Sequence, residues 1–582
     1  MHRNPSARQP SGPSRRYAIG LAVALLGTGL LLAGPAGAAG PVVAERFLIA
    51  TADPRASAAG LSILERGGSA ADAAIAAQLV LGLVEPQSSG LGGGAFLLHH
   101  EAASGRIVTL DGRETAPAAA GPDLFLDPAG EPLPFAAAVA SGRAVGVPGL
   151  PRLLEEAHRR FGRLPWAELF APAIALAEAG FSVSPRLARA IAQAAETGLA
   201  DQRAARALFL DDEGRPPPAG AILRNPAYAR TLRLLAEGGA AAFYEGPIAR
   251  EILAAVAEGH GRPGAMSAAD LAGYRVVERP AVCTLYRGRE VCGMGPPSSG
   301  GVAVAQILGL LEPFDLAALG PSLRAVHLLL EASRLAFADR DRFLADPDHE
   351  PVPVEGLLDP GYLDARRRLI DPARSLGRAP AGEPPRRQGA LPADPAADTE
   401  HGTSHLVVVD AQGNALSMTT TIEASMGSRL VAGGFLLNNQ LTDFAFLPVR
   451  DGRPVANRVA GGKRPRSSMA PTIVREAGRP VLLLGSPGGS RIIGYVVKTL
   501  VAALDWGLDP RAAIELGHVL NRNGPSEIEV GGLWTAFAEP LESRGHEVRI
   551  LPLDSGLQAI AIAPGRLLGA ADPRREGSAL GR

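Results

Sequence analysis

The sequence has few lysines, few cysteines and few aromatic residues. Lys463 and Lys498 are the only lysines among 582 residues, so arginine carries almost all of the positive charge. The formal net charge of −1 gives no electrostatic reason to expect nucleic acid or an anionic membrane surface as a partner. Neither class of binding protein is therefore predicted.

Several common catalytic motifs are also missing. The chain contains no G-x-S-x-G, no H-E-x-x-H and no G-x-x-x-x-G-K-[ST], which excludes the usual hydrolase serine, the zinc-protease helix and the P-loop. The glycine cluster GLGGGA, from Gly90, lacks the last glycine and the following helix of a dinucleotide-binding fingerprint. A tight turn is the simpler interpretation.

Long apolar runs are absent beyond the N-terminus. There, Arg15 and Arg16 precede an apolar run, residues 18–34, and the small residues PAGAAG. This order predicts a secretory signal over residues 1–38, cleaved after Ala38. An uncleaved membrane anchor is the alternative, but the run is short for a span. We expect a periplasmic or secreted protein without stable membrane association.

The two cysteines, Cys283 and Cys292, lie in CTLYRGREVC. If Arg287 and Gly288 form a two-residue hairpin turn, Cys283 falls directly opposite Cys292. An oxidising compartment would permit a disulfide, whereas two free core thiols are the other possibility. No histidine lies nearby, so a zinc site is not predicted.

The chain changes character near residue 400. Before residue 377 amphipathic helices dominate, and one of them is predicted to begin at the N-cap Ser69 with Asp72 in its first turn. Residues 377–402 are rich in proline and predict a mobile loop, and strand patterns follow it. Strands from both parts can share sheets that helices cover, so the parts need not form separate domains.

Thr403 opens the first strand pattern after this loop. As an internal residue it would be an ordinary β-branched strand residue. If the chain were cut between Gly402 and Thr403, the new α-amine, with a pKa of ~7.7 to 8, could accept the proton of the threonine hydroxyl. Gly402 provides the backbone freedom that attack of Thr403 on its carbonyl requires. The position therefore suits a self-cleaving nucleophile.

A series of long motifs supports this interpretation. The segments TSHLVVVDAQGNALSMTTT, FLLNNQLTDF, KRPRSSMAPTIV and GSPGGSRII follow one another after Gly402, and GGSAADAAIAAQLVLGLVEPQSSGLGGG and DGRETAP precede it. Together they resemble the γ-glutamyltranspeptidases, glutathione-hydrolysing members of the N-terminal nucleophile hydrolases. The resemblance covers almost the whole chain after residue 38.

The resemblance implies an α/β (α+β) fold, a four-layer αββα sandwich. Self-cleavage would produce a heterodimer of a large subunit, residues 39–402, and a small catalytic subunit, residues 403–582. The implied activity is cleavage of γ-glutamyl amides such as glutathione, with transfer of the γ-glutamyl group to water or an amine acceptor. This chemistry needs no metal and no organic cofactor.

The resemblance also assigns roles to single residues. Thr403 matches the nucleophile, Thr421 matches a threonine that orients it, and the N–H groups of Gly488 and Gly489 match the oxyanion hole. The remaining matches concern the charged end of the γ-glutamyl group: Arg113, Ser467 and Ser468 for the α-carboxylate, and Gln440 and Asp443 for the α-ammonium. Glu423 stands where many members have asparagine and would add a carboxylate beside the ammonium.

Residues 444–462 do not match the lid motif of some members. One alternative function is a glutaryl-type (cephalosporin) acylase of the same architecture, because a glutaryl group has the terminal carboxylate but no ammonium. The other is a non-processing exported binding protein that retains the fold. The presence of Thr403, Thr421 and the glycine pair argues against the second alternative.

Overall fold

The computed structural model describes residues 40–385 and 402–582. The predicted signal and its cleavage point therefore lie outside the described residues, as does most of the predicted loop. Among the residues that are described, no helix is both long and apolar enough to span a bilayer. The described residues from 41 onward form one compact unit.

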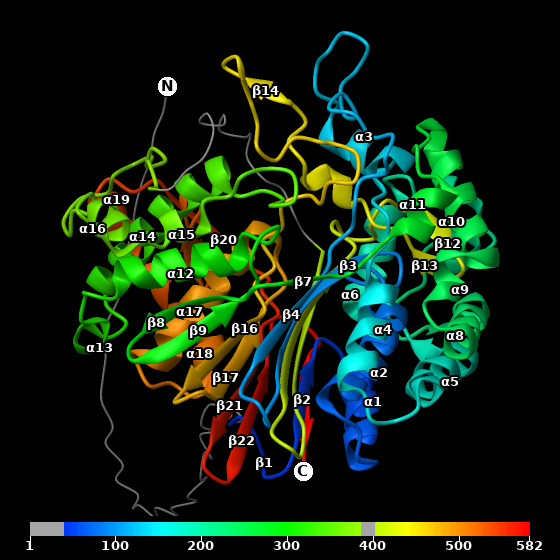
Figure 1. Ribbon diagram of the computed structural model, residues 1–582, viewed down its shortest axis with the longest axis horizontal. Coiled ribbons are helices and arrows are strands. Elements are labelled where there is room, and N and C mark those ends of the chain that lie inside the picture. Colours follow the sequence, from blue (N-terminus) through cyan, green and yellow to red (C-terminus); the bar gives the residue numbers. More distant parts are fainter. Residues whose placement is uncertain (1–39, 386–401) are drawn as a thin grey trace, which may run out of the picture. The chain divides into compact units, whose positions relative to one another are not determined.

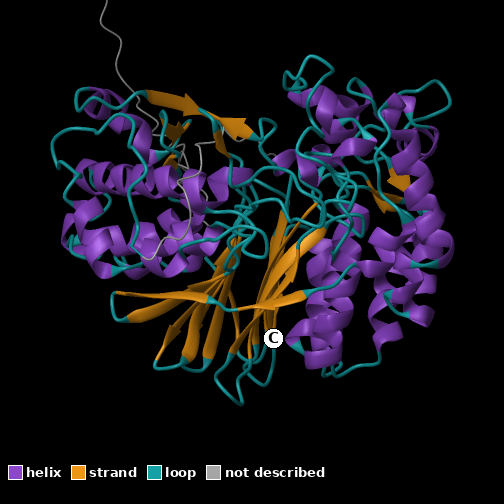
Figure 2. Cartoon of the chain, turned by 45° about the horizontal axis from the view of Figure 1, so that its top comes forward, coloured by secondary structure: helices purple, strands orange, loops and turns teal. Residues whose placement is uncertain are grey.

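Two seven-stranded sheets form the centre of this unit (Figures 1 and 2). In spatial order the first contains β1 (Val42–Ala44), β22 (Arg566–Ala571), β21 (Gln558–Ala563), β17 (Arg479–Gly485), β16 (Thr472–Glu476), β9 (Arg289–Gly293) and β8 (Val282–Tyr286). The second contains β23 (Ser578–Gly581), β2 (Leu48–Thr51), β10 (Ser404–Val409), β11 (Ala415–Thr421), β3 (Gly94–His100), β4 (Ile107–Gly112) and β7 (Val277–Arg279).

Helices cover the outer face of each sheet. Beside the second sheet lie α1 (Pro54–Glu65), α2 (Ala70–Val84), α4 (Leu150–Phe161), α5 (Ala171–Ala179), α6 (Pro185–Ala195), α8 (Pro226–Gly238) and α10 (Gly246–Glu258). Beside the first lie α12 (Gly300–Leu311), α14 (Leu323–Phe343), α17 (Ile492–Leu504) and α18 (Pro510–Glu515). The architecture is thus the expected four-layer αββα sandwich.

Shorter elements lie around these layers. The helices are α3 (Phe135–Val139), α7 (Arg203–Phe209), α9 (Ala241–Tyr244), α11 (Ala268–Gly273), α13 (Leu316–Leu319), α15 (Val354–Leu357), α16 (Pro360–Arg367) and α19 (Ala538–Glu542). The strands are β18 (Val519–Asn521), β19 (Ser526–Glu529) and β20 (Val548–Leu551) in one small sheet, and the pairs β5 (Phe181–Ser182) with β6 (Ile222–Leu223), β12 (Val431–Ala432) with β13 (Phe435–Leu436), and β14 (Val449–Arg450) with β15 (Arg453–Pro454).

The side-chain alternation of β10 shows why both faces of this strand are buried. Leu406 and Val408 belong to the core beneath helices α1 and α2, whereas Val407 and Val409 belong to the core between the sheets. Successive side chains of a strand point to opposite faces, so a strand between two cores must be apolar throughout. The run LVVV, residues 406–409, satisfies this requirement.

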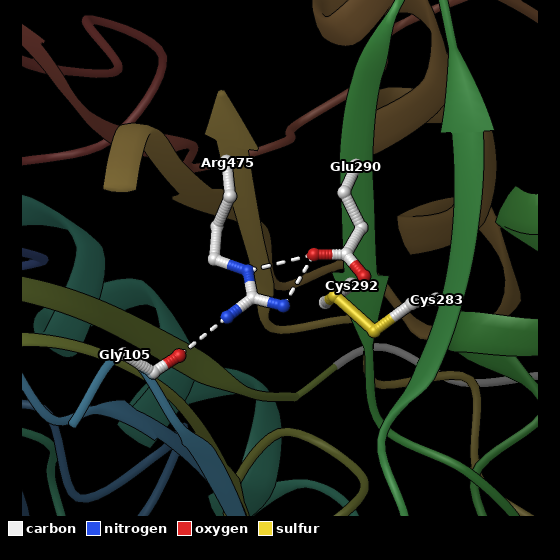
Figure 3. Close-up of a disulfide and its surroundings, with 5 residues drawn as sticks. All are labelled: Gly105, Cys283, Glu290, Cys292 and Arg475. Carbon is white, nitrogen blue, oxygen red and sulfur yellow. Dashed lines mark hydrogen bonds and ion pairs between the residues drawn. A yellow bond between two sulfur atoms is a disulfide. The ribbon is translucent and has the colours of Figure 1, made fainter. Parts of the chain in front are cut away.

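Two local predictions are confirmed. Helix α2 begins after Ser69, whose side chain accepts a hydrogen bond from the N–H of Asp72 in a reciprocal capping box. The hairpin of β8 and β9 pairs Cys283 with Cys292, and the two form a disulfide (Figure 3). The same hairpin is tied to β16 by the ion pair between Arg475 and Glu290.

The described part of the predicted loop, residues 377–385, is fixed by hydrogen bonds. The side chain of Asn523 both donates to and accepts from the backbone of Ala379. Just before it, Glu331 of α14 accepts hydrogen bonds from Ser375 and from the N–H of Leu376 at 2.8 Å each. The chain before residue 386 is therefore held against α14.

Candidate active site

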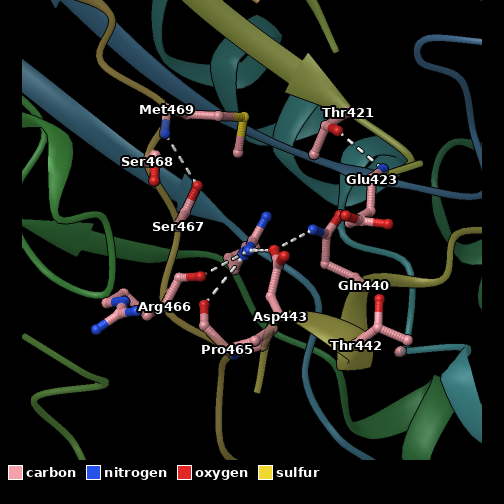
Figure 4. A network of polar contacts seen from close by, with 12 residues as sticks. Thr421, Glu423, Gln440, Thr442, Asp443, Pro465, Arg466, Ser467, Ser468 and Met469 are labelled. Atoms are coloured by element: carbon pink, nitrogen blue, oxygen red, sulfur yellow. Dashed lines mark hydrogen bonds and ion pairs between the residues drawn. The ribbon is translucent and has the colours of Figure 1, made fainter. Parts of the chain in front are cut away.

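Thr403 lies directly before β10, beside the end of β11. Because Ser404 pairs with Thr420 in the antiparallel ladder, the next pair outward brings Thr403 to Thr421. The two hydroxyl oxygens are 3.0 Å apart. Thr421 Oγ1 also accepts a hydrogen bond of 2.9 Å from the N–H of Glu423 (Figure 4), which fixes the orientation of this hydroxyl.

The glycine cluster after α2, which begins at Gly90, packs beneath the pair of Thr403 and Thr421. A Cβ atom on Gly93 would lie 2.0 Å from the carbonyl oxygen of Thr421, and one on Gly92 would lie 2.1 Å from the carbonyl oxygen of Leu436. No side chain fits at such distances. The glycines therefore allow two backbone segments to approach closely at the site, in addition to forming a turn.

The backbone at Thr403 is in an unusual conformation. Its φ is 125°, a value that β-branched residues rarely adopt and that costs about 1–3 kcal/mol. The preceding Gly402 is buried, and a Cβ atom there would lie 2.0 Å from the carbonyl oxygen of Glu423. Strain and tight packing thus meet at the bond between these two residues.

One cavity brings together most of the predicted substrate-binding residues. It is lined by Arg113, Thr403, Thr421, Glu423, Gln440, Asp443, Ser467 and Met469. Its free volume is about 10 Å³, close to the minimum that holds one water molecule. Of the catalytic and substrate-binding residues predicted from the sequence, Ser468, Gly488 and Gly489 do not line it.

The cavity is narrow because two oppositely charged side chains of its lining are in contact. Arg113 and Asp443 form a buried ion pair across the cavity, and Gln440 donates a hydrogen bond of 2.6 Å to the same carboxylate (Figure 4). The guanidinium of Arg113 is also held by the carbonyl oxygens of Pro465 and Arg466, each at 3.1 Å. Arg113 is therefore rigidly placed.

Glu423 is the second carboxyl group of the cavity. Its Oε2 accepts a hydrogen bond from Asn439, whereas Oε1 accepts none from the described residues. Burial raises the pKa of Glu423 well above its usual range, and the negative charge of Asp443 raises it further. Both effects favour the protonated form of Glu423, which lies beside the ion pair of Arg113 and Asp443.

Ser467 and Ser468 are anchored differently. Ser467 Oγ accepts a hydrogen bond of 3.1 Å from the N–H of Met469 and lines the cavity. Ser468 Oγ instead accepts a hydrogen bond of 2.6 Å from Arg340, a buried side chain of α14. In this conformation Ser467 is the hydroxyl that faces Arg113 and Asp443.

Gly488 and Gly489 form the turn between β17 and α17. Their φ values are 127° and 60°, and a Cβ atom on Gly488 would lie 2.7 Å from the ring of Tyr495. Only glycine fits this turn without strain. Gly488 lines a second cavity rather than the one around Arg113.

Residues that the sequence did not single out support the site from behind. Arg575 donates a hydrogen bond of 3.0 Å to the carbonyl oxygen of Thr403, and Ser404 Oγ donates one of 3.0 Å to the buried Glu85. Glu114, beside Arg113, is fully buried as well. Arg575 lies in the C-terminal DPRRE and Glu114 in DGRETAP, charged segments where an apolar strand ends, which is the only signal the sequence offered.

The described residues contain one cluster with metal-ligand side chains besides the disulfide region: His327, Glu331 and His546. Each of these donor atoms already has a protein partner. The two imidazoles share a hydrogen bond of 2.8 Å, and Glu331 accepts bonds from Arg334, Ser375 and Leu376. The cluster therefore has a structural explanation without an ion.

The described architecture and cavity are those of a hydrolase with two central sheets and a strand-end threonine. A family model described as gamma-glutamyltranspeptidase matches residues 56–582. The chain is 36% identical to the glutathione hydrolase proenzyme of Bacillus subtilis (strain 168) over 550 residues, 93% of this chain and 92% of that one. It is 38% identical to the acylase ACY 1 proenzyme of Pseudomonas sp. (strain V22) over 550 residues, 92% of this chain and 94% of that one.

Solved structures agree. The cephalosporin acylase of Bacillus halodurans matches with a TM-score of 0.80 at 28% identity, covering 94% of this chain and 97% of the acylase. The chain therefore belongs to the γ-glutamyltranspeptidase family, within the N-terminal nucleophile hydrolase fold.

Proposed function

We propose that this chain is a self-processing γ-glutamyl hydrolase and transferase that acts on glutathione and related γ-glutamyl compounds, with Thr403 as nucleophile. Relatives named as glutathione hydrolase proenzymes support the activity. The observation that carries the residue assignment is the 3.0 Å contact between Thr403 and Thr421 at the edge of a cavity that holds one buried arginine and two carboxyl groups.

Self-cleavage follows from the local backbone. Attack of Thr403 Oγ1 on the Gly402 carbonyl carbon forms an ester as the C–N bond breaks, and the hydroxyl proton passes to the nitrogen, which becomes the α-amine of Thr403. Water then hydrolyses the ester, which leaves a carboxylate on Gly402 and a free hydroxyl on Thr403. The positive φ of Thr403 disappears as a constraint once no residue precedes it, so cleavage relieves the strain. The reaction would give chains of residues 39–402 and 403–582.

Substrate turnover repeats this chemistry. The α-amine of Thr403, with a pKa of ~7.7 to 8, accepts the hydroxyl proton while Oγ1 attacks the γ-amide carbonyl. The N–H groups of Gly488 and Gly489 stabilise the oxyanion, and the amide nitrogen departs with the proton. Water or an acceptor amine then attacks the γ-glutamyl ester and frees Thr403.

Recognition of the γ-glutamyl group is an exchange of ion-pair partners. Without substrate, Arg113 and Asp443 form an ion pair with each other. When a γ-glutamyl group binds, its α-carboxylate would pair with Arg113 and its α-ammonium would pair with Asp443. With Glu423 protonated, the sum of these four charges is zero. A glutaryl group lacks the ammonium and would leave one buried negative charge without a partner, which is costly.

The alternative function, a glutaryl-type acylase, is supported by relatives that are named as acylases. A change at Asp443 distinguishes this activity from γ-glutamyl turnover. Asp443→Asn is expected to lower kcat/KM for a γ-glutamyl anilide at least about 100-fold, the effect of an unpaired buried charge, and to change turnover of the glutaryl anilide much less. Equal losses on both substrates would show that Asp443 does not bind the ammonium.

The proposal is tested first by intact mass and a denaturing gel of the mature protein. Wild type is expected to give two chains, the smaller one beginning at Thr403, and Thr403→Ala a single chain. The control Thr442→Ala changes a neighbouring threonine outside the hydroxyl pair and should process normally. A wild-type protein that stays whole would favour the binding-protein alternative.

Export is part of the proposal. The basic, apolar and small-residue order of residues 1–38 supports a cleaved secretory signal. An N-terminus at residue 39 in protein recovered from the periplasm or the medium is the expected finding.

A further inference from the structure

The two serines predicted to bind the α-carboxylate, Ser467 and Ser468 (Figure 4), are held by a turn of the predicted large chain. This turn is PPSSGG, residues 296–301, which leads into α12. Ser467 donates its N–H to the carbonyl oxygen of Pro297 at 3.0 Å, and its own carbonyl oxygen accepts the N–H of Ser299 at 2.7 Å. The backbone of Ser467 is therefore fixed through both of its polar groups.

Two side chains of the PPSSGG turn add to this hold. Ser299 Oγ donates a hydrogen bond of 2.6 Å to the carbonyl oxygen of Ser467, which thus accepts two bonds from one residue. Ser298 Oγ donates one of 2.6 Å to the carbonyl oxygen of Met469. Both serines of the turn are fully buried. Because a buried carbonyl oxygen that loses its donor is costly, these bonds keep the segment in one position.

Arg340 of α14 connects the PPSSGG turn to the second serine of the pair. Its side chain is 2% exposed. Nε donates a hydrogen bond of 3.0 Å to Ser299 Oγ, and Nη2 donates one of 2.6 Å to Ser468 Oγ. Nη1 forms an ion pair of 2.6 Å with Asp341, which balances the buried charge. A guanidinium presents its N–H groups in a rigid planar fork, so one side chain sets the positions of both hydroxyl groups.

These contacts decide where the hydroxyl protons of the serine pair can go. A guanidinium only donates, so Ser468 Oγ must accept from Arg340. Ser467 Oγ likewise accepts, from the N–H of Met469. Neither hydroxyl donates to an acceptor among the described residues. Both protons are therefore left for an anion, and the acceptor oxygens of a carboxylate suit two such donors.

We infer that Arg340 and Ser299 are positioning residues that make the serine pair selective for acyl groups with an α-carboxylate. Arg340 holds a lone pair of Ser468 Oγ, so that the proton of this hydroxyl points to the carboxylate. Ser468 lies outside the closed cavity, and its proton is reached when substrate separates Arg113 from Asp443. Ser299 keeps the backbone of the pair in place. This inference rests on the proposed function and adds residues to its α-carboxylate site.

Two anilides that differ only in the α-carboxylate test the inference: L-γ-glutamyl-4-nitroanilide and 4-aminobutyryl-4-nitroanilide. The measured quantity is the ratio of their kcat/KM values, because damage to folding or to Thr403 lowers both alike. Wild type is expected to favour the γ-glutamyl substrate. Arg340→Lys should lower the ratio about tenfold, since an ammonium lacks the fork that bonds both hydroxyls. Ser299→Ala should lower it about fivefold. Arg324→Lys, at an exposed arginine of the same helix, should leave it unchanged.

A double-mutant cycle shows whether Arg340 acts through Ser468. Ser468→Ala by itself should lower the ratio about tenfold. In the Ser468→Ala background, Arg340→Lys should lower it no further, because the hydroxyl that it orients is already gone. A residue with only a structural role would not show this coupling. Losses that simply multiply would overturn the assignment of Arg340 to Ser468.

The outcomes distinguish the inference from the proposed function. If wild type hydrolyses neither anilide, the proposed function fails and the inference with it. If wild type hydrolyses only the γ-glutamyl anilide, the inhibition constants of L-glutamate and 4-aminobutanoate, which differ in the same group, replace the ratio. A ratio within about twofold of wild type in both Arg340→Lys and Ser299→Ala refutes the inference alone. If the buried Arg340 variant does not fold or process, Ser299→Ala carries the test.

Discussion

Glu114 is a buried acid beside Arg113 whose two oxygens accept no hydrogen bond from the described residues. Burial raises the pKa of Glu114 from 4.5 to about 8, against the opposing charge of Arg113. The folded chain therefore keeps a proton that the unfolded chain loses above pH 4.5. By linkage, the free energy of unfolding falls as pH rises from about 4.5 to about 8.

Glu114→Gln is expected to remove the part of the fall in unfolding free energy with rising pH that comes from Glu114. The variant should gain stability relative to its parent at pH 8, by on the order of a few kcal/mol, and little at pH 5. Urea unfolding at both pH values, in the uncleaved Thr403→Ala background, measures the difference on a single chain. Glu237→Gln, an exposed glutamate of α8, is the control. A gain of equal size at both pH values would contradict the buried, protonated Glu114.

At the scale of elements, the end of strand β11 positions the nucleophile. Thr421 Oγ1 bonds to Thr403, whereas Thr420 Oγ1, on the opposite face of the strand, has no partner in the described structure. The two threonines therefore offer a matched pair of isosteric substitutions.

Thr421→Val should slow self-cleavage and γ-glutamyl turnover by about 100-fold, because the nucleophile loses the hydroxyl that orients it. Thr420→Val should leave both rates within about threefold of wild type, since it removes no hydrogen bond. Time courses of processing on denaturing gels, with kcat and KM of the processed fraction, measure the effects. Rates that fall alike in both variants would point to strand packing as the cause.

At the scale of the whole molecule, the two predicted chains share both sheets. Strands β10 and β11 of the predicted small chain pair with β2 and β3 of the large one, and β16 pairs with β9. Separation of the chains would expose both cores and the edges of several strands.

The processed chains are therefore expected to migrate as one species in size-exclusion chromatography without denaturant and to unfold in a single transition. Uncleaved Thr403→Ala should elute at the same volume. Two species in native buffer, or separate unfolding transitions for the two chains, would contradict the shared sheets.

The series of strand patterns after Gly402 and the capped helix at Ser69 were predictable because each depends on local periodicity and capping. The position of Cys283 opposite Cys292 could also be predicted, since a two-residue turn fixes the register of its hairpin. In the same way, the long motifs around Thr403 and Asp443 allowed a prediction of the family. The charged DPRRE segment, by contrast, gave no indication that Arg575 contacts Thr403.

The sequence by itself determined the family, the layer architecture and the candidates for nucleophile and γ-glutamyl contacts, because these depend on local patterns and long motifs. Only the tertiary structure decided that Arg113 and Asp443 close on each other and that Glu423 is buried against Asp443. It also placed Arg340 of α14 against Ser468. Charge balance in a buried site depends on which groups face each other across the fold, and chain order does not specify that.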